Sequence, residues 1–162
     1  EELRFHIMSW VSQLNDFVNV DFNFHLNIEE PFFSDKAMMI IIMQTLIDNA
    51  IKYKRADIES KVDVRVSTNK SGILIKVEDN GEGISEEVED KVFDMFFRGN
   101  TKSKGTGLGL YLARKAVDRL GGTLYLKSRK DKGVTIRISL PTLTDEEKDN
   151  TRLFIGKQSK KI

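Results

Sequence analysis

GTGLGL, residues 105–110, stands directly before an apolar-periodic run over residues 110–120, and that run predicts a helix. Gly105, Gly107 and Gly109 carry no side chains that would hold a ligand away from the backbone. The N–H groups and the partial positive charge of a helix N-terminus are well suited to bind phosphate. The spacing matches neither the dinucleotide fingerprint nor the GxxxxGK(S/T) loop, so a flexible, glycine-rich helix cap is an equally good interpretation of this stretch alone.

A second group of polar residues lies in LIDNAIKY, residues 46–53. Asn49, Lys52 and Tyr53 are three and four positions apart, so a helix presents them on one face. An amide oxygen suits a magnesium ion, which also binds nucleotide phosphates. The lysine can then meet phosphate charge, and the tyrosine ring can lie against a base. The alternative is an ordinary surface Asn and Lys beside a half-buried Tyr.

The third motif, DNGEG at residues 79–83, ends a predicted strand. Asp, Asn and Gly favour a tight turn, which is the simplest interpretation. A turn does not require the second glycine, Gly83, which lets the chain pass close to a flat ligand beside Asp79. A carboxylate at the end of a buried strand needs hydrogen-bond donors, and the exocyclic amine of adenine would supply one.

Taken together, LIDNAIKY, DNGEG, VFDMFFRG and GTGLGL resemble the N, G1, F and G2 boxes of the catalytic ATP-binding domain of sensor histidine kinases. That domain belongs to the GHKL superfamily, which it shares with type II topoisomerases, mismatch-repair ATPases and heat-shock chaperones. The resemblance covers about Asp35 to Pro141, with the four motifs in the family's order. It implies ATP and magnesium as cofactors and a histidine kinase as the function.

The resemblance also implies a role for individual residues. Asn49 corresponds to the magnesium ligand, Lys52 and Tyr53 to the phosphate and adenine contacts beside it, and Asp79 to the acceptor of a hydrogen bond from adenine N6. The catalytic residues that it implies at the phosphates are Lys52, Arg98 and Lys104. The other binding residues that it implies are Gly81, Gly83 and Ile84 around the base, Gly105, Thr106, Gly107, Leu108, Gly109 and Leu110 at the phosphates, and Thr135 supporting the adenine and its aspartate.

Thr45 occupies the position, four residues before Asn49, where superfamily members that hydrolyse ATP place a glutamate. A threonine hydroxyl is no general base at neutral pH, so the resemblance implies transfer to an imidazole nitrogen rather than to water. Neither His6 nor His25 is a convincing acceptor, because His6 lacks the family's flanking residues and His25 falls on the wet face of a predicted strand. The implied partners are therefore a separate dimerisation and phosphoacceptor domain and a response regulator.

Two other functions stay open from the sequence. One is a serine or threonine kinase of the anti-sigma-factor type, although such kinases usually retain the glutamate. The other is an interaction module that senses ATP and transfers nothing.

The patterns predict a two-layer α/β sandwich, with helices on one face of a mixed, mostly antiparallel sheet. Asp35 is the expected N-cap of the helix that carries LIDNAIKY. The predicted helices are 3–17, 35–54, 86–93 and 110–120, and the predicted strands are 20–28, 62–66, 73–77, 123–127 and 134–140. The corresponding division of the chain is a helix over 1–18, the ATP-binding domain over 19–141 and a charged tail over 142–162.

Composition fits one compact domain, with 162 residues that are 40% hydrophobic and 31% charged. A net charge of +1 gives no bulk attraction to nucleic acid, so no nucleic-acid partner is expected. The chain has no cysteine and no visible secretory signal, which suits the cytoplasm. Its first segment has a heptad-like seam, so we expect a fragment of a longer, homodimeric receptor, with an amphipathic helix packed on its own domain as the alternative. The seam consists of Leu3, Ile7, Trp10, Leu14 and Phe17.

Overall fold

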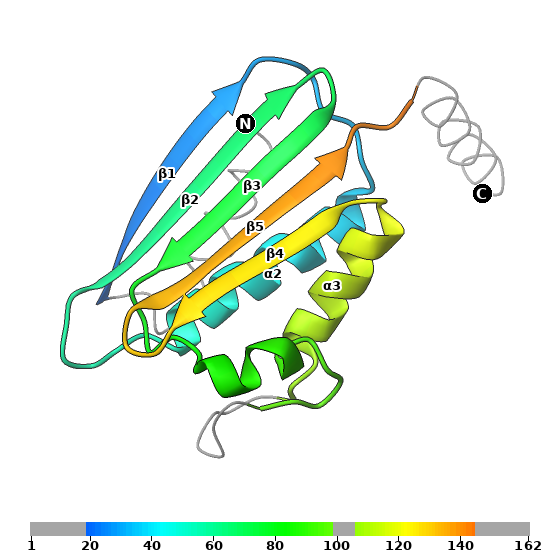
Figure 1. The fold of residues 1–162 in the computed structure, drawn as a ribbon. Coiled ribbons are helices and arrows are strands. Elements are labelled where there is room, and N and C mark those ends of the chain that lie inside the picture. The colour runs from blue at the N-terminus through cyan, green and yellow to red at the C-terminus, as the bar shows by residue number, and fades with distance from the viewer. Residues whose placement is uncertain (1–18, 99–105, 145–162) are drawn as a thin grey trace, which may run out of the picture.

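The structure is a computed structural model that describes residues 19–98 and 106–144 (Figure 1). Five strands form one sheet in the order β1-β2-β3-β5-β4. Of the four neighbouring pairs in this sheet, β1 and β2 are parallel and the other three are antiparallel. The strands are β1 (Val20–Ile28), β2 (Ser60–Asn69), β3 (Gly72–Asp79), β4 (Thr123–Arg129) and β5 (Gly133–Pro141).

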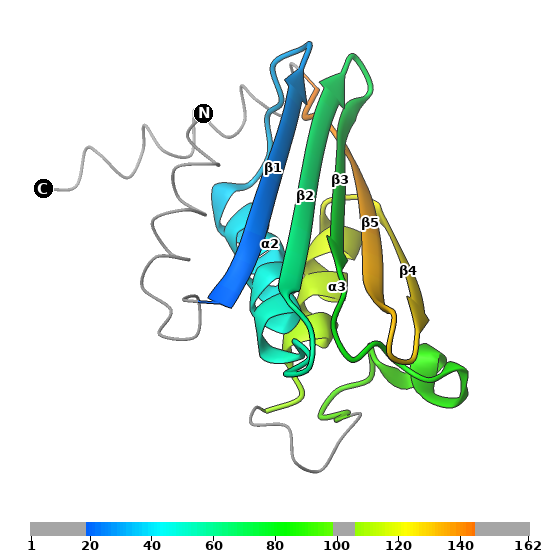
Figure 2. The ribbon, with the colours of Figure 1, turned by 90° about the vertical axis from the view of Figure 1, so that its left-hand side faces the viewer.

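The helices α2 (Lys36–Lys52) and α3 (Gly109–Arg119) pack side by side against one face of the sheet, as Figures 1 and 2 show. The described part of the chain is therefore a two-layer sandwich, and the predicted fold class is confirmed. None of its helices has the length and apolar character needed to cross a membrane.

The core lies between the two layers and is built from strict alternation in the strands. In β2, Val62, Val64 and Val66 are buried while the residues between them are more exposed. Because successive side chains of a strand point to opposite faces, the polar residues between these valines lie on the other face of the sheet. His25 lies on that outer face, exposed and 3.2 Å from Asp63, as its place in the alternation predicts.

Helix α2 contributes most of the helical side of the core. Its buried residues are Met39, Ile42, Met43, Leu46, Ile47, Ala50 and Ile51. Asp35 is its N-cap, as predicted, and Oδ1 accepts a hydrogen bond of 3.0 Å from the Met38 N–H. The helix ends two residues earlier than expected, at Lys52, where the Tyr53 N–H closes the last turn on the Asn49 carbonyl.

The short helix expected over residues 86–93 is confirmed in part, because it is a 3₁₀ helix and ends at Lys91. The structure has a six-residue 3₁₀ helix there, η2 (Glu86–Lys91), with no buried residue. An apolar face buried against the core stabilises most α-helices in proteins, and the buried Val92 comes only after η2 has ended. The predicted helix over residues 3–17, His6, and the tail beyond residue 144 lie outside the described residues, so the predicted division of the chain stays a prediction.

Candidate functional site

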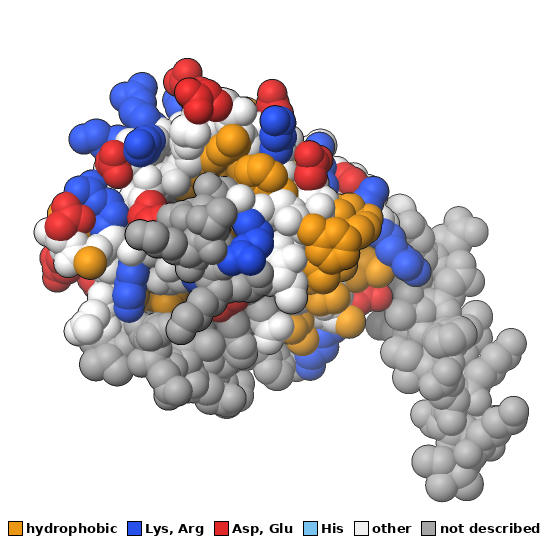
Figure 3. All heavy atoms as spheres, turned by 90° about the horizontal axis from the view of Figure 1, so that it is seen from below, with side chains coloured by type: hydrophobic (Ala, Val, Ile, Leu, Met, Phe, Trp, Pro, Cys, Tyr) orange, Lys and Arg blue, Asp and Glu red, His pale blue; other side chains and the backbone are white. Residues whose placement is uncertain are grey.

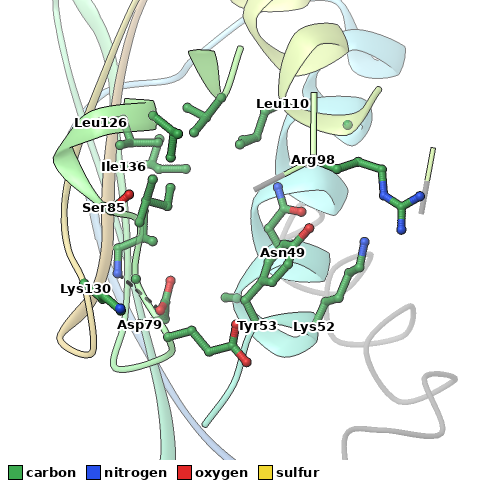
Figure 4. A pocket seen from close by; sticks show the side chains of 18 of the residues that line it. Asn49, Lys52, Tyr53, Asp79, Ser85, Arg98, Leu110, Leu126, Lys130 and Ile136 are labelled. Atoms are coloured by element: carbon green, nitrogen blue, oxygen red, sulfur yellow. Dashed lines mark hydrogen bonds between the residues drawn. The ribbon is translucent and has the colours of Figure 1, made fainter. Parts of the chain in front are cut away.

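A cavity of about 1010 Å³ opens at one end of the two-layer core (Figure 4). The last turn of α2 forms one wall, with Asn49, Lys52 and Tyr53. The sheet forms the opposite wall, where Asp79 ends β3 and Ile136 lies in β5. The start of α3 and the segment around η2 close the sides. Three of the four motifs that the sequence singled out therefore lie at α2, at the end of β3 and at the start of α3, and VFDMFFRG follows η2.

Asp79 is half-buried and partly paired. Its Oδ1 accepts hydrogen bonds from the N–H groups of Gly81, at 2.9 Å, and Val134, at 3.2 Å. Oδ2 accepts none from the described residues. Burial raises the pKa of this carboxyl from 3.8 to about 6, although the two N–H groups favour the charged form. The site thus offers one carboxylate oxygen that is available to a donor on a ligand.

Asn49 faces Asp79 across the cavity (Figure 4). Its Nδ2 is buried and has no hydrogen-bond partner among the described residues. A buried polar group without a partner is costly, so this amide is suited to meet a bound ligand. The described residues hold no cluster of three or more His, Cys, Asp or Glu that could bind a metal by itself. A magnesium ion held through the Asn49 oxygen would therefore take its other ligands from phosphate and water, which agrees with its chemistry.

Two cations lie on the same side of the cavity as Asn49. Lys52 is exposed, and its Nζ lies 5.0 Å from the centre of the Tyr53 ring. Arg98, which follows the aromatic residues of VFDMFFRG, also lines the cavity (Figure 4). Lys52 and Arg98 therefore place positive charge on the helix side of the site, whereas Asp79 places a carboxylate on the sheet side.

The glycines allow approaches of the backbone that a side chain would prevent. Gly83 has φ of 66°, and a Cβ there would lie 2.1 Å from the Arg129 carbonyl oxygen. Gly107 has φ of 71°, and a Cβ there would lie 2.7 Å from the carbonyl oxygen of Phe97. Both positions need the left-handed conformation as well as the missing side chain.

The start of α3 has no side-chain cap. Leu108 is the N-cap residue and makes no side-chain hydrogen bond to the first turn. The first N–H groups of a helix have no intrahelical partner, so an anion at this end can accept hydrogen bonds from them. Gly107, Gly109 and Leu110 line the cavity at this point.

The structure brings most of the predicted site residues together. Those that line the cavity are Asn49, Lys52, Tyr53, Asp79, Gly83, Ile84, Arg98, Thr106, Gly107, Gly109 and Leu110. Leu108 lies behind this surface, and so does Gly81, where a Cβ would lie 2.4 Å from the Tyr53 carbonyl oxygen. Gly81 therefore acts through close packing. Lys104 and Gly105 lie outside the described residues.

Thr135 does not line the cavity, so the structure contradicts its predicted place beside the adenine. Val134 and Ile136 line it instead, and the residue between them on a strand points to the opposite face. In this part of β5, the backbone N–H of Val134 donates the hydrogen bond to the Asp79 carboxylate.

The sequence reasoning also missed much of the apolar wall. The cavity is lined in addition by Val77, Val88, Val92, Phe97, Leu126, Val134 and Ile136. Alternation in β5, continued from Ile138 and Leu140, was the signal that could have found Val134 and Ile136. Arg55, Lys130 and Asp131 line the open end near Asp79, and no motif marks them.

An apolar slot with a carboxylate at one end, and with cations and an uncapped helix N-terminus at the other, is the arrangement of a nucleotide-binding domain. Residues 34–144 match the family described as histidine kinase-, DNA gyrase B-, and HSP90-like ATPase, and the chain belongs to this family.

The relatives agree with this placement. Sensor protein CiaH of Streptococcus pneumoniae is 37% identical over 131 residues, which are 78% of this chain and 29% of that protein. Sensor histidine kinase YvrG of Bacillus subtilis is 37% identical over 110 residues, which are 66% of this chain and 19% of that protein. This chain therefore spans less than a third of the length of either relative.

Among solved structures, the nucleotide-free catalytic domain of histidine kinase ThkA has a TM-score of 0.73 and 27% identity, covering 87% of this chain and 91% of that one. The predicted resemblance to the catalytic ATP-binding domain of sensor histidine kinases is thereby confirmed.

Proposed function

We propose that this chain binds ATP with magnesium and transfers the γ-phosphoryl group to a histidine on a separate dimerisation and phosphoacceptor domain. A response regulator then takes the phosphoryl group. The observation that carries this proposal is the position of Asp79 and Asn49 on opposite walls of one cavity, each with a polar atom that the described residues leave without a hydrogen bond. We expect the full-length protein to work as a homodimer, with this domain in the cytoplasm.

At the sheet side, the free Oδ2 of Asp79 accepts a hydrogen bond from the exocyclic amine of adenine. The base then lies between Tyr53 and the apolar residues of the sheet, such as Leu126 and Ile136. These contacts fix the orientation of the nucleotide and are not themselves part of the chemical step.

At the helix side, the Asn49 oxygen would hold a magnesium ion, which would neutralise charge on the phosphates. Lys52 and Arg98 add positive charge on the same side, and Lys104 belongs to the same predicted set. The N–H groups in the first turn of α3 donate hydrogen bonds to phosphate oxygens. Phosphoryl transfer depends mainly on such positioning and charge neutralisation.

Thr45 supports transfer to a protein nucleophile rather than to water. It is half-buried in α2, and its Cγ2 would lie 3.3 Å from a Cβ at Gly109, so it packs against the start of α3. A hydroxyl at this position cannot deprotonate water at neutral pH. An imidazole nitrogen needs no such base.

Incubation of the full-length protein with γ-labelled ATP tests this function. We expect labelled protein whose phosphate is lost in acid and retained in base, because phosphohistidine is acid-labile. An acid-stable product would instead support a serine or threonine kinase. ATP binding without any labelled product would support a sensing module, and either result would overturn the proposal.

A further inference from the structure

Hydrogen bonds connect two segments at the base end of the cavity. We call residues 79–84 the base loop and residues 129–133 the hairpin turn. The Asp131 N–H donates to the Glu82 carbonyl at 2.6 Å, and the Val134 N–H, just after the hairpin turn, donates to Asp79 Oδ1 at 3.2 Å. The backbones also touch, because a Cβ on Gly133 would lie 1.9 Å from the Asp79 carbonyl oxygen. A displacement of either segment must therefore move the other.

Ser128 lies at the junction of the two segments. Its Oγ accepts a hydrogen bond of 2.8 Å from the Ile84 N–H and donates one of 2.9 Å to the Gly133 carbonyl. Its hydroxyl uses both its donor and an acceptor position, so its orientation is fixed. Ser128 is half-buried and is not among the residues that line the cavity. Any effect of this side chain on a nucleotide must therefore pass through its two partners.

Both hydrogen-bond partners of Ser128 are connected to the part of the cavity that is proposed to hold the base. Ile84 lines the cavity. The Gly133 carbonyl belongs to the same peptide unit as the Val134 N–H, which donates to Asp79 Oδ1. Because a peptide unit is planar, fixing its carbonyl also fixes the direction of its N–H. The Ser128 hydroxyl thus holds the wall of the base pocket and the donor that orients the Asp79 carboxylate.

We propose that Ser128 is a positioning residue for base recognition: through Ile84 and the Gly133–Val134 peptide it directs the free oxygen of Asp79 toward the base and so sets the preference for adenine. This inference rests on the proposed function, since it assumes that the cavity holds a nucleotide. A guanine presents a carbonyl oxygen, not an amine, at the corresponding position, and a carboxylate oxygen cannot donate to it.

Calorimetric titration of the 162-residue chain with ATP and GTP, in the presence of magnesium, tests the inference. Ser128→Ala removes both hydrogen bonds, and we expect ATP to bind about three- to tenfold more weakly while GTP changes less. Ser128→Thr keeps the hydroxyl and should restore wild-type affinity. Ser139→Ala is the matched control, because Ser139 is exposed in β5 and does not line the cavity. If Ser128→Ala fails to fold, Ser128→Cys serves as a second variant of similar size with a much weaker donor.

A double-mutant cycle separates positioning from general stability. If Ser128 acts through Asp79, Ser128→Ala should have little further effect on ATP affinity in an Asp79→Asn background. An equal loss in both backgrounds, or an unchanged ratio of ATP to GTP affinity, would overturn the inference while leaving the proposed function intact. A wild-type chain that binds neither nucleotide would instead overturn the proposed function.

Discussion

The Asp79 carboxylate has two oxygens in different situations. Oδ1 is held by two backbone N–H groups, and Oδ2 has no partner among the described residues. If Oδ2 accepts a charge-assisted hydrogen bond from adenine, Asp79→Asn should weaken ATP by about 1.5 to 3 kcal/mol, which is more than tenfold in affinity. Calorimetry measures this directly. Asp21→Asn, an exposed residue in β1, makes the same charge change away from the cavity and should leave the affinity unchanged.

The raised pKa of Asp79 predicts a dependence of ATP affinity on pH. Only the ionised carboxylate can accept through both oxygens, so affinity should fall as pH decreases through about 6. Below that value, linkage predicts a loss that approaches about tenfold per pH unit. The nucleotide phosphates also titrate, so at each pH the ATP affinity of the wild type is divided by that of Asp79→Asn. A ratio that stays constant from pH 5 to pH 8 would contradict the assignment.

Stability without ligand should change in the opposite direction. The folded protein holds the Asp79 proton more tightly than the unfolded chain, since the pKa is about 6 in the fold and 3.8 in the reference. Between these values the folded state binds more protons, so this group's contribution to the free energy of unfolding increases as pH falls from above 6 toward 4. Denaturant unfolding of wild type and Asp79→Asn across this range measures the difference. A gap between the two that does not depend on pH would show that burial leaves this carboxyl unperturbed.

Neighbouring glycines at the start of α3 should respond differently to substitution. Gly107 has φ of 71°, and its Cβ would lie 2.7 Å from backbone atoms of Phe96 and Phe97. Gly107→Ala should therefore destabilise the ligand-free domain by at least about 1–2 kcal/mol, the cost of a left-handed conformation alone. For Gly109 the nearest atom is the Thr45 Cγ2 at 3.3 Å, and alanine is favoured over glycine in a helix. Gly109→Ala should be nearly neutral in denaturant unfolding, and equal losses for the pair would refute this explanation.

Sequence periodicity predicted the regular elements well, because their local signals agree with their packing. The alternation in residues 62–66 and 73–77 matches the antiparallel β2–β3 pair, where Val64 lies opposite Val77. The Asp35 cap is local and needs no tertiary context. The short helix expected over residues 86–93 is a 3₁₀ helix that ends at Lys91, because none of η2 is buried and an α-helix there would lack packing on the core.

The site was harder to predict than the elements. Motifs placed Asn49, Asp79 and Gly107 at one cavity because each lies at the end of a regular element that the fold brings together. Thr135 was misplaced by one residue, which on a strand reverses the face. Ser128 carries no motif signal at all. Its importance comes from contacts with Ile84 and Gly133, and the contact with Ile84 bridges segments far apart in the sequence.

In the molecule as a whole, the cavity is a junction between the two layers. Asp79 belongs to the sheet, Asn49 to α2 and Gly109 to α3, so a ligand that reaches all three ties the layers together. A ligand that binds only the folded state at a hundred times its Kd adds about 2.7 kcal/mol of stability. For a domain of this size, that corresponds to an increase in Tm of roughly 5–10 °C.

Binding of nucleotide fragments tests whether ATP must contact both the base end and the phosphate end of the cavity. With magnesium present, scanning calorimetry should show a smaller increase in Tm for adenosine or triphosphate alone than for ATP at the same concentration, because each fragment makes only part of the contacts that ATP makes with the cavity. Asp79→Asn should reduce the response to adenosine and leave the response to triphosphate, whereas Asn49→Ala should do the reverse. If adenosine alone matched ATP, the contacts proposed for the phosphates at Asn49, Lys52 and the start of α3 would contribute nothing to binding. These three positions would then have to be excluded from the nucleotide site.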